Sequence, residues 1–249
     1  MEEFLNSWYG IALVLAFDVV ALVVAIAITY RWFFKRVLDV LASAVCLVVT
    51  SPLFLAIILR GKGFQKAHEG VLPTLYKKVY RVSKKEKVVA LNYFETRDSD
   101  GDILGSYGKW LEDSKLYKLP LLLDVFLGKL SFIGVKPLLR SEAEFVEDEV
   151  EKDRFLVRAG LIHPLVCVGD KDTTYEETFL EEKKYVWKFG FFGDIKIFFT
   201  WLLNTIRAEG DFYMGLTREE TYGQYLLKNE MITTEDYAVA CELDNSSEV

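Results

Sequence analysis

Two long apolar runs near the N-terminus constrain the fold of this chain more than any other feature. The first covers residues 11–30, and a helix of that length matches the roughly 30 Å hydrocarbon core of a membrane. No basic residue precedes the run, so it lacks the front end of a signal peptide. Aromatic residues typical of membrane interfaces flank it at both ends: Trp8, Tyr9, Tyr30 and Trp32. We predict that residues 1–30 hold a transmembrane helix, with the N-terminus outside.

The second run covers residues 37–59 and is interrupted by Ser51-Pro52. Proline removes a backbone donor, and the part before it would be only about 21 Å long, too short to cross. Basic residues flank the run on both sides: Arg31, Lys35 and Arg36 before it, and Arg60, Lys62 and Lys66 after it. We therefore expect residues 31–60 to form a re-entrant helix-break-helix, with Ser51 or Thr50 satisfying the freed backbone groups. An ordinary proline-kinked span is the alternative.

Charge is unevenly distributed along the chain. The formal net charge is −7, yet residues 230–249 carry acidic side chains and no basic one, which predicts an acidic disordered tail. The middle of the chain is slightly basic and suits an anionic membrane surface or phosphate groups. Asp18 lies inside the first apolar run, where we expect it to face a partner helix or to be protonated.

The remaining segment, residues 61–229, predicts a mixed α/β domain. The three cysteines and two histidines are scattered, so we expect no disulfide, metal site or resident cofactor, and nothing indicates nucleic-acid binding. In its first half, this domain is expected to contain a strand over 87–94, a loop over 98–105, an amphipathic helix over 116–126, and an extended segment from Ser131 into a turn at Gly134 ended by Pro137. In its second half we expect a charged solvated helix over 142–158, an interfacial or core helix over 191–206, and a helix over 217–231.

Motifs spread over most of residues 31–207 resemble one family. Lys35, Arg36 and Asp39 are similar to its KRxxD motif, and Ser51-Pro52 to the break of its re-entrant helix. Gly108-Lys109-Trp110-Leu111 is similar to G-R-F-L, and the residues Leu116, Leu119 and Pro120 match the frame of L-D-E-L-P. The motif G-D-M-S-x-x-G-P-R-P is matched by Gly128, Ser131, Gly134 and Pro137. Arg158-Ala159-Gly160 matches a following turn, and Tyr185 and Asp194 match two later elements. The chain thus resembles the bacterial sugar transferases, monotopic phosphoglycosyltransferases that start glycan assembly on a polyprenyl phosphate.

This resemblance implies a membrane-associated α/β protein of the bacterial inner membrane, with its phosphoglycosyltransferase-like domain cytoplasmic. In the family, the Asp of L-D-E-L-P attacks the β-phosphate of a nucleotide diphosphate sugar with the help of Mg²⁺. Polyprenyl phosphate then accepts the phosphosugar. Such chemistry requires a carboxylate nucleophile, and cations that neutralise the phosphates.

The chain departs from the family where that chemistry takes place. Tyr117 stands at the Asp position and Lys118 at the Glu position of the dyad. A tyrosine with a pKa near 10 is a poor nucleophile at pH 7, and a lysine repels Mg²⁺. Further departures are Asn92-Tyr93-Phe94 for the family's K-F-R, Lys129 for the Asp of G-D-M-S, Val135-Lys136-Pro137 for P-R-P, and Ile162-His163 for a later T-G. Lys136 keeps a phosphate-binding charge without arginine's bidentate fork, and we expect His163 to be a packing residue.

Three hypotheses follow from these departures. The leading one is a catalytically inactive member that pairs in the membrane with an active homologue or another glycan-assembly protein. A second is a working enzyme that uses Tyr117 or Asp113, with Mg²⁺, to move a phosphosugar from a UDP-sugar to undecaprenyl phosphate. A third is a sensor of nucleotide sugar or polyprenyl phosphate. Glu112-Asp113 and Asp124 are the nearest replacement acids, but neither completes a second constellation. The resemblance places Asp124 at a position where the family has Asn.

Overall fold

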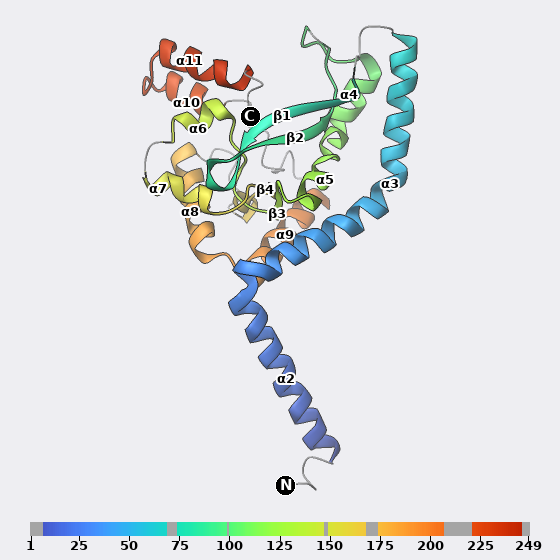
Figure 1. The fold of residues 1–249 in the computed structure, drawn as a ribbon, viewed down its shortest axis with the longest axis vertical. Helices are drawn as coiled ribbons and strands as arrows, with labels where there is room; N and C mark the ends of the chain where they lie inside the picture. The colour runs from blue at the N-terminus through green and yellow to red at the C-terminus, as the bar shows by residue number, and fades with distance from the viewer. Residues whose placement is uncertain are drawn as a thin grey trace.

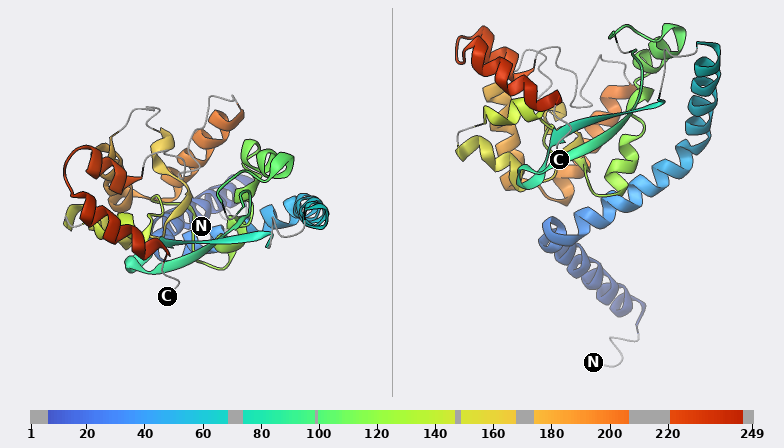
Figure 2. Two further views of the ribbon diagram at one scale, coloured as in Figure 1. Left: turned by 90° about the horizontal axis from the view of Figure 1, so that it is seen from above. Right: turned by 45° about the horizontal axis from the view of Figure 1, so that its top comes forward.

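The computed structural model describes residues 7–68, 74–98, 100–146, 149–167, 174–206 and 221–245. Two long apolar helices precede a mixed domain of helices and strands (Figure 1). The first helix, α2 (Trp8–Thr29), projects away from the domain, and the second, α3 (Lys35–Ala67), runs along its side. Two further views show the same arrangement (Figure 2). A π-helical turn, Tyr30–Phe34, joins the two helices.

Helix α2 has the expected place and length. Ser7 caps it by accepting a hydrogen bond from the backbone N–H of Gly10 at 3.2 Å. Its apolar side chains lie exposed around its circumference, as does Asp18. A helix that is apolar on all sides and covered by no other part of the protein is typical of a membrane span. By length and composition, both α2 and α3 could cross a membrane.

Helix α3 continues through Pro52, while Figure 1 shows it changing direction part-way along. Proline cannot donate to the carbonyl four residues earlier, which here belongs to Val48. The hydroxyl of Ser51 donates to that same carbonyl at 2.8 Å, and the Thr50 hydroxyl donates to Cys46 O at 2.7 Å. Ser51 therefore satisfies the carbonyl that Pro52 leaves without a donor, within one kinked helix, whereas Thr50 bonds a different carbonyl.

Both halves of α3 pack on the domain. Cys46 and Leu47 lie against a buried cluster that includes Leu121 and Val125, whereas Phe54 and Ile57 of the second half pack in another cluster. The opposite side of α3 exposes a series of apolar residues: Leu38, Leu41, Val45, Val48, Val49, Leu55 and Leu59. The helix therefore has one face on the protein and one face for an apolar environment.

The domain has two small sheets with helices around them. Strands β1 (Tyr76–Val82) and β2 (Val88–Phe94) form an antiparallel hairpin, and β3 (Ser131–Ile133) pairs in parallel with β4 (Gly160–Ile162). The expected strand over 87–94 is confirmed as β2. The helices are α4 (Gly105–Asp113), α5 (Leu121–Phe126), α6 (Arg140–Glu144), α7 (Glu149–Lys152), α8 (Tyr175–Lys188), α9 (Phe191–Ile206), α10 (Tyr222–Lys228) and α11 (Thr234–Asn245).

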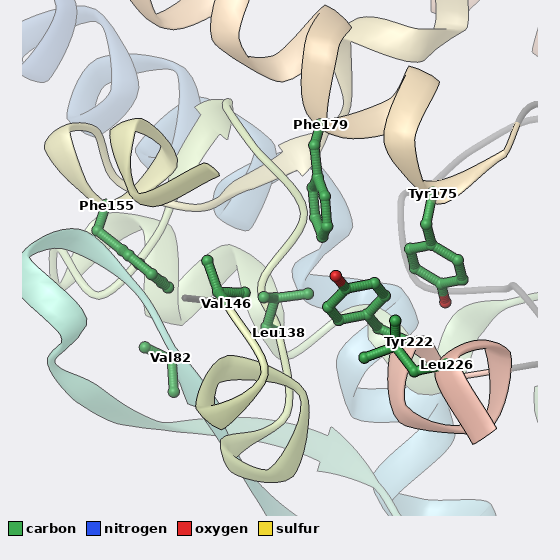
Figure 3. Close-up of a cluster of buried hydrophobic side chains, with 8 residues drawn as sticks. All are labelled: Val82, Leu138, Val146, Phe155, Tyr175, Phe179, Tyr222 and Leu226. Atoms are coloured by element: carbon green, nitrogen blue, oxygen red, sulfur yellow. The ribbon is translucent and has the colours of Figure 1, made fainter. Parts of the chain in front are cut away.

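One buried cluster joins the hairpin to the C-terminal helices. It contains Val82, Leu138, Val146, Phe155, Tyr175, Phe179, Tyr222 and Leu226 (Figure 3). The ring centroids of Tyr175 and Tyr222 lie 5.0 Å apart, as do those of Phe179 and Tyr222, distances typical of favourable aromatic pairs. This cluster fixes α8 and α10 against the hairpin.

Two helix predictions need correction. The stretch 116–126 divides into a 3₁₀ turn, Leu116–Lys118, and α5, because Pro120 lacks the N–H that would continue the first turn. The stretch 142–158 contains the end of α6, then α7 and a 3₁₀ turn, Asp153–Leu156, and it is not a solvated face. Glu142 is 1% and Arg154 3% exposed.

The acidic tail is ordered over most of its described length, so the prediction of disorder is wrong there. Residues of α11 pack on α6: both backbone and hydroxyl of Ser141 donate to the carboxylate of Asp244, and Ala240 is buried. Pairing of the Asp244 carboxylate with the two donors of Ser141 holds this helix on α6 despite its charge. Of the helix expected over 217–231, α10 is present, and residues 217–220 lie outside the described residues.

Candidate functional site

The KRxxD residues anchor the apolar helix α3 to the domain. The Lys35 ammonium pairs with the carboxylate of Asp194 on α9, which is 4% exposed. Tyr30 donates its hydroxyl to Asp194 Oδ2 at 2.6 Å, and Tyr185 on α8 donates to Oδ1 at 3.0 Å. The N-terminal helices thus meet α8 and α9, which lie far along the chain, at one carboxylate.

Arg36 and Asp39 complete this anchor on the next turn of α3. The Arg36 guanidinium donates to Val125 O at 2.7 Å and to Phe126 O at 2.8 Å, capping the C-terminus of α5. A side chain at Gly128 (φ +85°) would place its Cβ 2.9 Å from Arg36 Nη2, so glycine suits this turn. Asp39 accepts the Ser131 hydroxyl at 2.7 Å and the Phe132 N–H at 3.1 Å, which ties α3 to β3.

Tyr117 and Lys118 line a cavity of about 400 Å³ between the β1–β2 hairpin and α4, which we call the dyad cavity. Tyr117 stacks on Tyr93 with ring centroids 6.2 Å apart, and the Lys118 ammonium lies 5.4 Å from the centre of the Tyr117 ring. Five basic residues line the cavity, namely Lys77, Arg81, Arg97, Lys115 and Lys118, against two acids, Glu95 and Glu112. The cavity is therefore electropositive.

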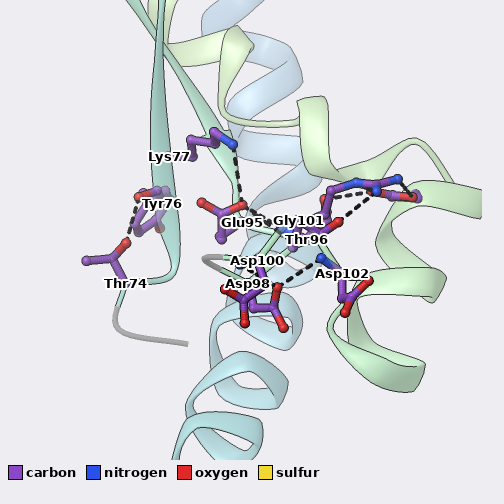
Figure 4. Close-up of polar contacts among 11 residues, drawn as sticks. Thr74, Tyr76, Lys77, Glu95, Thr96, Asp98, Asp100, Gly101 and Asp102 are labelled. Carbon is purple, nitrogen blue, oxygen red and sulfur yellow. Dashed lines mark hydrogen bonds and ion pairs between the residues drawn. The ribbon is translucent and has the colours of Figure 1, made fainter. Parts of the chain in front are cut away.

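Both acids of the dyad cavity lie beside cations. Glu112 accepts from Arg97 Nε at 3.1 Å and from the Thr96 hydroxyl at 2.9 Å. Glu95 lies 4.0 Å from the Lys77 ammonium, and Figure 4 shows this pair. The neighbouring loop is held by Asp98, whose carboxylate accepts the N–H of Asp100 and Asp102.

The chemistry available at the dyad cavity differs from that of a carboxylate pair. Burial, and then the charge of Glu112, raise the pKa of the Tyr117 phenol above its usual value, so it stays protonated at neutral pH. Asp113 is exposed on α4 and does not line the cavity. No group of three His, Cys, Asp or Glu side chains able to hold a metal exists among the described residues. The cation-rich lining does not fit Mg²⁺, which prefers carboxylate oxygens.

The sequence matches the bacterial sugar transferase family over residues 29–208. The chain belongs to this family. It is also similar to a protein described as an uncharacterized sugar transferase, EpsL, of Bacillus subtilis strain 168, with 26% identity over 185 residues. The matched region covers 71% of this chain and 89% of that relative. Membership of a sugar transferase family supports a glycosyltransferase-type role, and the two apolar helices fit membrane association.

Asp124, considered above as a replacement acid, belongs to a closed network in this family member. The side chain is 0% exposed and accepts the Asn92 N–H and the Asn92 side-chain amide, both at 2.7 Å. Lys129 donates to it at 2.9 Å and to Ala90 O at 2.6 Å. Asn92, Asp124 and Lys129 stand at three positions where this chain departs from the family pattern. In the structure the three side chains meet in a single buried contact, which no single position displays in the sequence.

Lys136 does not line the dyad cavity. Its ammonium lies 5.6 Å from the centre of the Tyr175 ring, and burial lowers its pKa. Its backbone N–H donates to Glu182 at 3.0 Å. The structure therefore places Lys136 apart from Tyr117 and Lys118, and its proposed role in phosphate binding stays a prediction.

Glu182 centres a buried network that the sequence analysis missed. Burial raises its pKa, but the Arg154 guanidinium and a hydrogen bond from His163 outweigh burial and hold the pKa below its usual value. Leu165 N–H donates to His163 Nδ1 at 3.1 Å, so the proton lies on Nε2, which donates to Glu182 at 2.6 Å. His163 is a packing residue, as expected. Nothing distinguishes Glu182 in sequence from Glu181 beside it.

Proposed function

We propose that this chain is a catalytically inactive bacterial sugar transferase homologue that acts as a membrane partner or regulatory subunit in polysaccharide or glycoconjugate assembly. The observation that carries the proposal is the dyad cavity, where Tyr117 and Lys118 stand in place of the two carboxylates. The remaining acids of that cavity, Glu95 and Glu112, lie against lysine or arginine.

Under this proposal, the dyad cavity lacks the groups that two steps of the family's reaction require. A phosphosugar intermediate requires an ionised nucleophile, and Tyr117 is protonated at neutral pH. Activation of the diphosphate by Mg²⁺ requires carboxylate ligands for the metal, and the two carboxylates of the cavity lining, Glu95 and Glu112, lie against Lys77 and Arg97. A rearranged site through Asp113 lacks support, since that side chain is exposed outside the cavity.

The anchor supports a structural role for the scaffold. Lys35, Arg36 and Asp39 all make side-chain contacts with the domain, and both halves of α3 pack on it. A bent helix that packs along the domain over both of its halves is compatible with a re-entrant topology in the inner membrane, with α2 spanning, the N-terminus outside and the domain cytoplasmic. The exposed apolar residues of α9, among them Phe192 and Phe199, suit an interfacial position.

An assay for UMP release tests the loss of activity. The purified full-length protein is incubated with a panel of UDP-sugars, undecaprenyl phosphate and Mg²⁺, beside a homologue with intact L-D-E-L-P. We expect release from the homologue only. Release by the unmodified chain that Tyr117→Phe or Asp113→Asn abolishes would show a rearranged enzyme instead.

Co-purification tests the partnership. The tagged chain is isolated from its native membrane in mild detergent and the bound proteins are identified by mass spectrometry. We expect a homologue with an intact dyad, or another glycan-assembly protein, in fixed stoichiometry. Recovery of the chain alone under conditions that preserve a known membrane complex would contradict the proposal.

The five cations of the dyad cavity favour a second candidate function, binding of nucleotide sugar or polyprenyl phosphate without turnover. Calorimetric titration of UDP-sugars into the full-length protein tests it. Lys118→Ala should weaken binding about tenfold or more, since a charge-assisted hydrogen bond to phosphate is lost. Lys78→Ala, an exposed charge outside the cavity, should leave binding unchanged, and absence of heat with the unmodified protein would remove this candidate.

A further inference from the structure

Two adjoining cavities lie where the apolar helices meet the domain, away from the dyad cavity. The first, of about 510 Å³, lies between the start of α3, the β1–β2 turn and the end of α8. The second, of about 420 Å³, shares Lys84 and Arg158 with the first. Their basic lining residues are Arg31, Lys35, Arg36, Lys84, Lys85, Lys87, Lys129 and Arg158. Asp39 is the acidic lining residue, and it accepts hydrogen bonds from β3.

The basic residues differ in what they contact. Lys35 pairs with Asp194, whereas Arg31 and Arg36 donate to backbone carbonyls. The side chains of Lys84 and Arg158 make neither an ion pair nor a hydrogen bond with any described residue. Burial, and then the charges of Arg158 and Lys85, lower the pKa of Lys84. The two shared cations therefore repel each other and lack an anion.

The hairpin turn separates its charges. Lys85 and Glu86 both have positive φ, at 59° and 56°, a conformation unusual outside glycine. Glu86 lines a different cavity together with Arg140 and Lys152, while Lys84, Lys85 and Lys87 line the second cavity. That second cavity has no acidic residue in its lining. The turn thus directs three lysines to one side and its acid to the other.

Apolar side chains surround this basic surface at the end of α2. Phe33 is 64%, Trp187 57% and Leu156 54% exposed, and the last two line the first cavity. Lipid head groups meet a spanning helix at its end, where aromatic residues and cations are both favoured. We propose that Lys84 and Arg158, with Lys85 and Lys87, bind the phosphate head group of an anionic phospholipid. This site is independent of the dyad cavity and of the proposed partnership.

A lipid fits this site better than a soluble phosphate does. The apolar rim of Leu156 and Trp187 offers nothing to a free ion, whereas it suits acyl chains beside a head group. The cavity lies at the end of the candidate membrane span that ends at Thr29, where lipid head groups would meet the protein. Each cation close to an anionic surface strengthens the attraction, so loss of two should weaken binding about tenfold or more.

Native mass spectrometry of the full-length protein tests the site. The protein in detergent is titrated with phosphatidylglycerol or phosphatidylcholine, and lipid adducts are counted for the unmodified chain, K84Q/R158Q and a matched control, K78Q/K109Q. Lys78 and Lys109 are exposed and line none of these cavities. We expect preference for phosphatidylglycerol, about tenfold weaker binding in K84Q/R158Q, and no change in the control. The charge-retaining variant K84R/R158K should bind as the unmodified chain does.

Any of the following outcomes would overturn the proposal of a lipid site. Equal adducts with both lipids would exclude head-group recognition, and equal loss in both charge variants would indicate general attraction without a site. Inorganic phosphate is added at millimolar concentration as a separate arm. Removal of the phosphatidylglycerol adducts by free phosphate would identify a soluble phosphate as the ligand. Circular dichroism and gel filtration of each variant distinguish a binding defect from misfolding.

Discussion

The anchor and the dyad cavity of this chain both occur where the family has defined motifs, yet they differ in what the residues do. At the anchor, Lys35, Arg36 and Asp39 match KRxxD and each makes short contacts with the domain. At the dyad cavity, Tyr117 and Lys118 stand where the resemblance places a carboxylate pair, next to Leu119 and Pro120 of the same frame. The comparison separates residues that hold the scaffold from residues that would react.

The difference teaches that the family pattern contains two independent requirements. Contacts between α3 and the domain depend on a few polar groups in buried places, where a change is costly whether or not the protein turns over substrate. Tyr117 packs on Tyr93 as an ordinary aromatic pair, and this contact needs no carboxylate at that position. The proposed loss of the reactive pair would therefore leave the anchor contacts intact.

The largest effect is expected at the anchor from Asp194→Ala. The change removes the acceptor of Tyr30 and Tyr185 and leaves Lys35 without its carboxylate. Breaking a buried ion pair from one side costs about 3–5 kcal/mol. Thermal unfolding of the full-length protein in detergent measures the loss. Lys196→Ala, an exposed charge on the same helix, should change little, and equal stability of the two variants would contradict the anchor role.

A smaller loss is expected from Asp124→Ala beside the dyad cavity. The variant leaves Asn92 and Lys129 without their shared acceptor, and unsatisfied buried donors cost about 1–3 kcal/mol. Denaturant unfolding measures this loss. Asp113→Ala on exposed α4 is the matched control and should be within about 0.5 kcal/mol of the unmodified chain. If Asp124→Ala is equally harmless, the network is not structural, and its role as a cation ligand has to be reconsidered.

The sequence predicts individual helices and strands better than it predicts which side chains from distant segments meet. Length and apolarity suffice for α2, and strand composition suffices for β2, because both signals are local. The breaks inside 142–158 and the order of α11 depend on Glu142 and Asp244 finding donors in distant segments, which no local pattern displays. The contact among Asn92, Asp124 and Lys129 is hidden for the same reason. The sequence shows each of the three residues, but it does not show that their side chains meet.

An alkaline titration tests the burial of the Tyr93 phenol in the dyad cavity, with an expected effect of about 1 kcal/mol on the free energy of unfolding. Burial raises the pKa of Tyr93 to about 12, from an unfolded value near 10. The folded state then favours the protonated phenol, so its contribution is complete below pH 10 and is lost as the pH rises towards 12. Unfolding free energy measured between pH 9 and 11 should fall less steeply in Tyr93→Phe. Parallel slopes would show that the Tyr93 phenol ionises as freely as in the unfolded chain.

The smallest effect is expected from Tyr117→Phe, and it tests the comparison most directly. The ring stacking on Tyr93 is kept and only the phenol is removed, so the stability change should stay within about 0.5 kcal/mol. A protonated phenol without a catalytic role also predicts no change in UMP release, which is measured beside unfolding on the same preparation. A variant as stable as the unmodified chain that loses a measurable release would identify Tyr117 as the nucleophile. The dyad cavity would then be a rearranged reactive site, and the division between scaffold and chemistry would fail there.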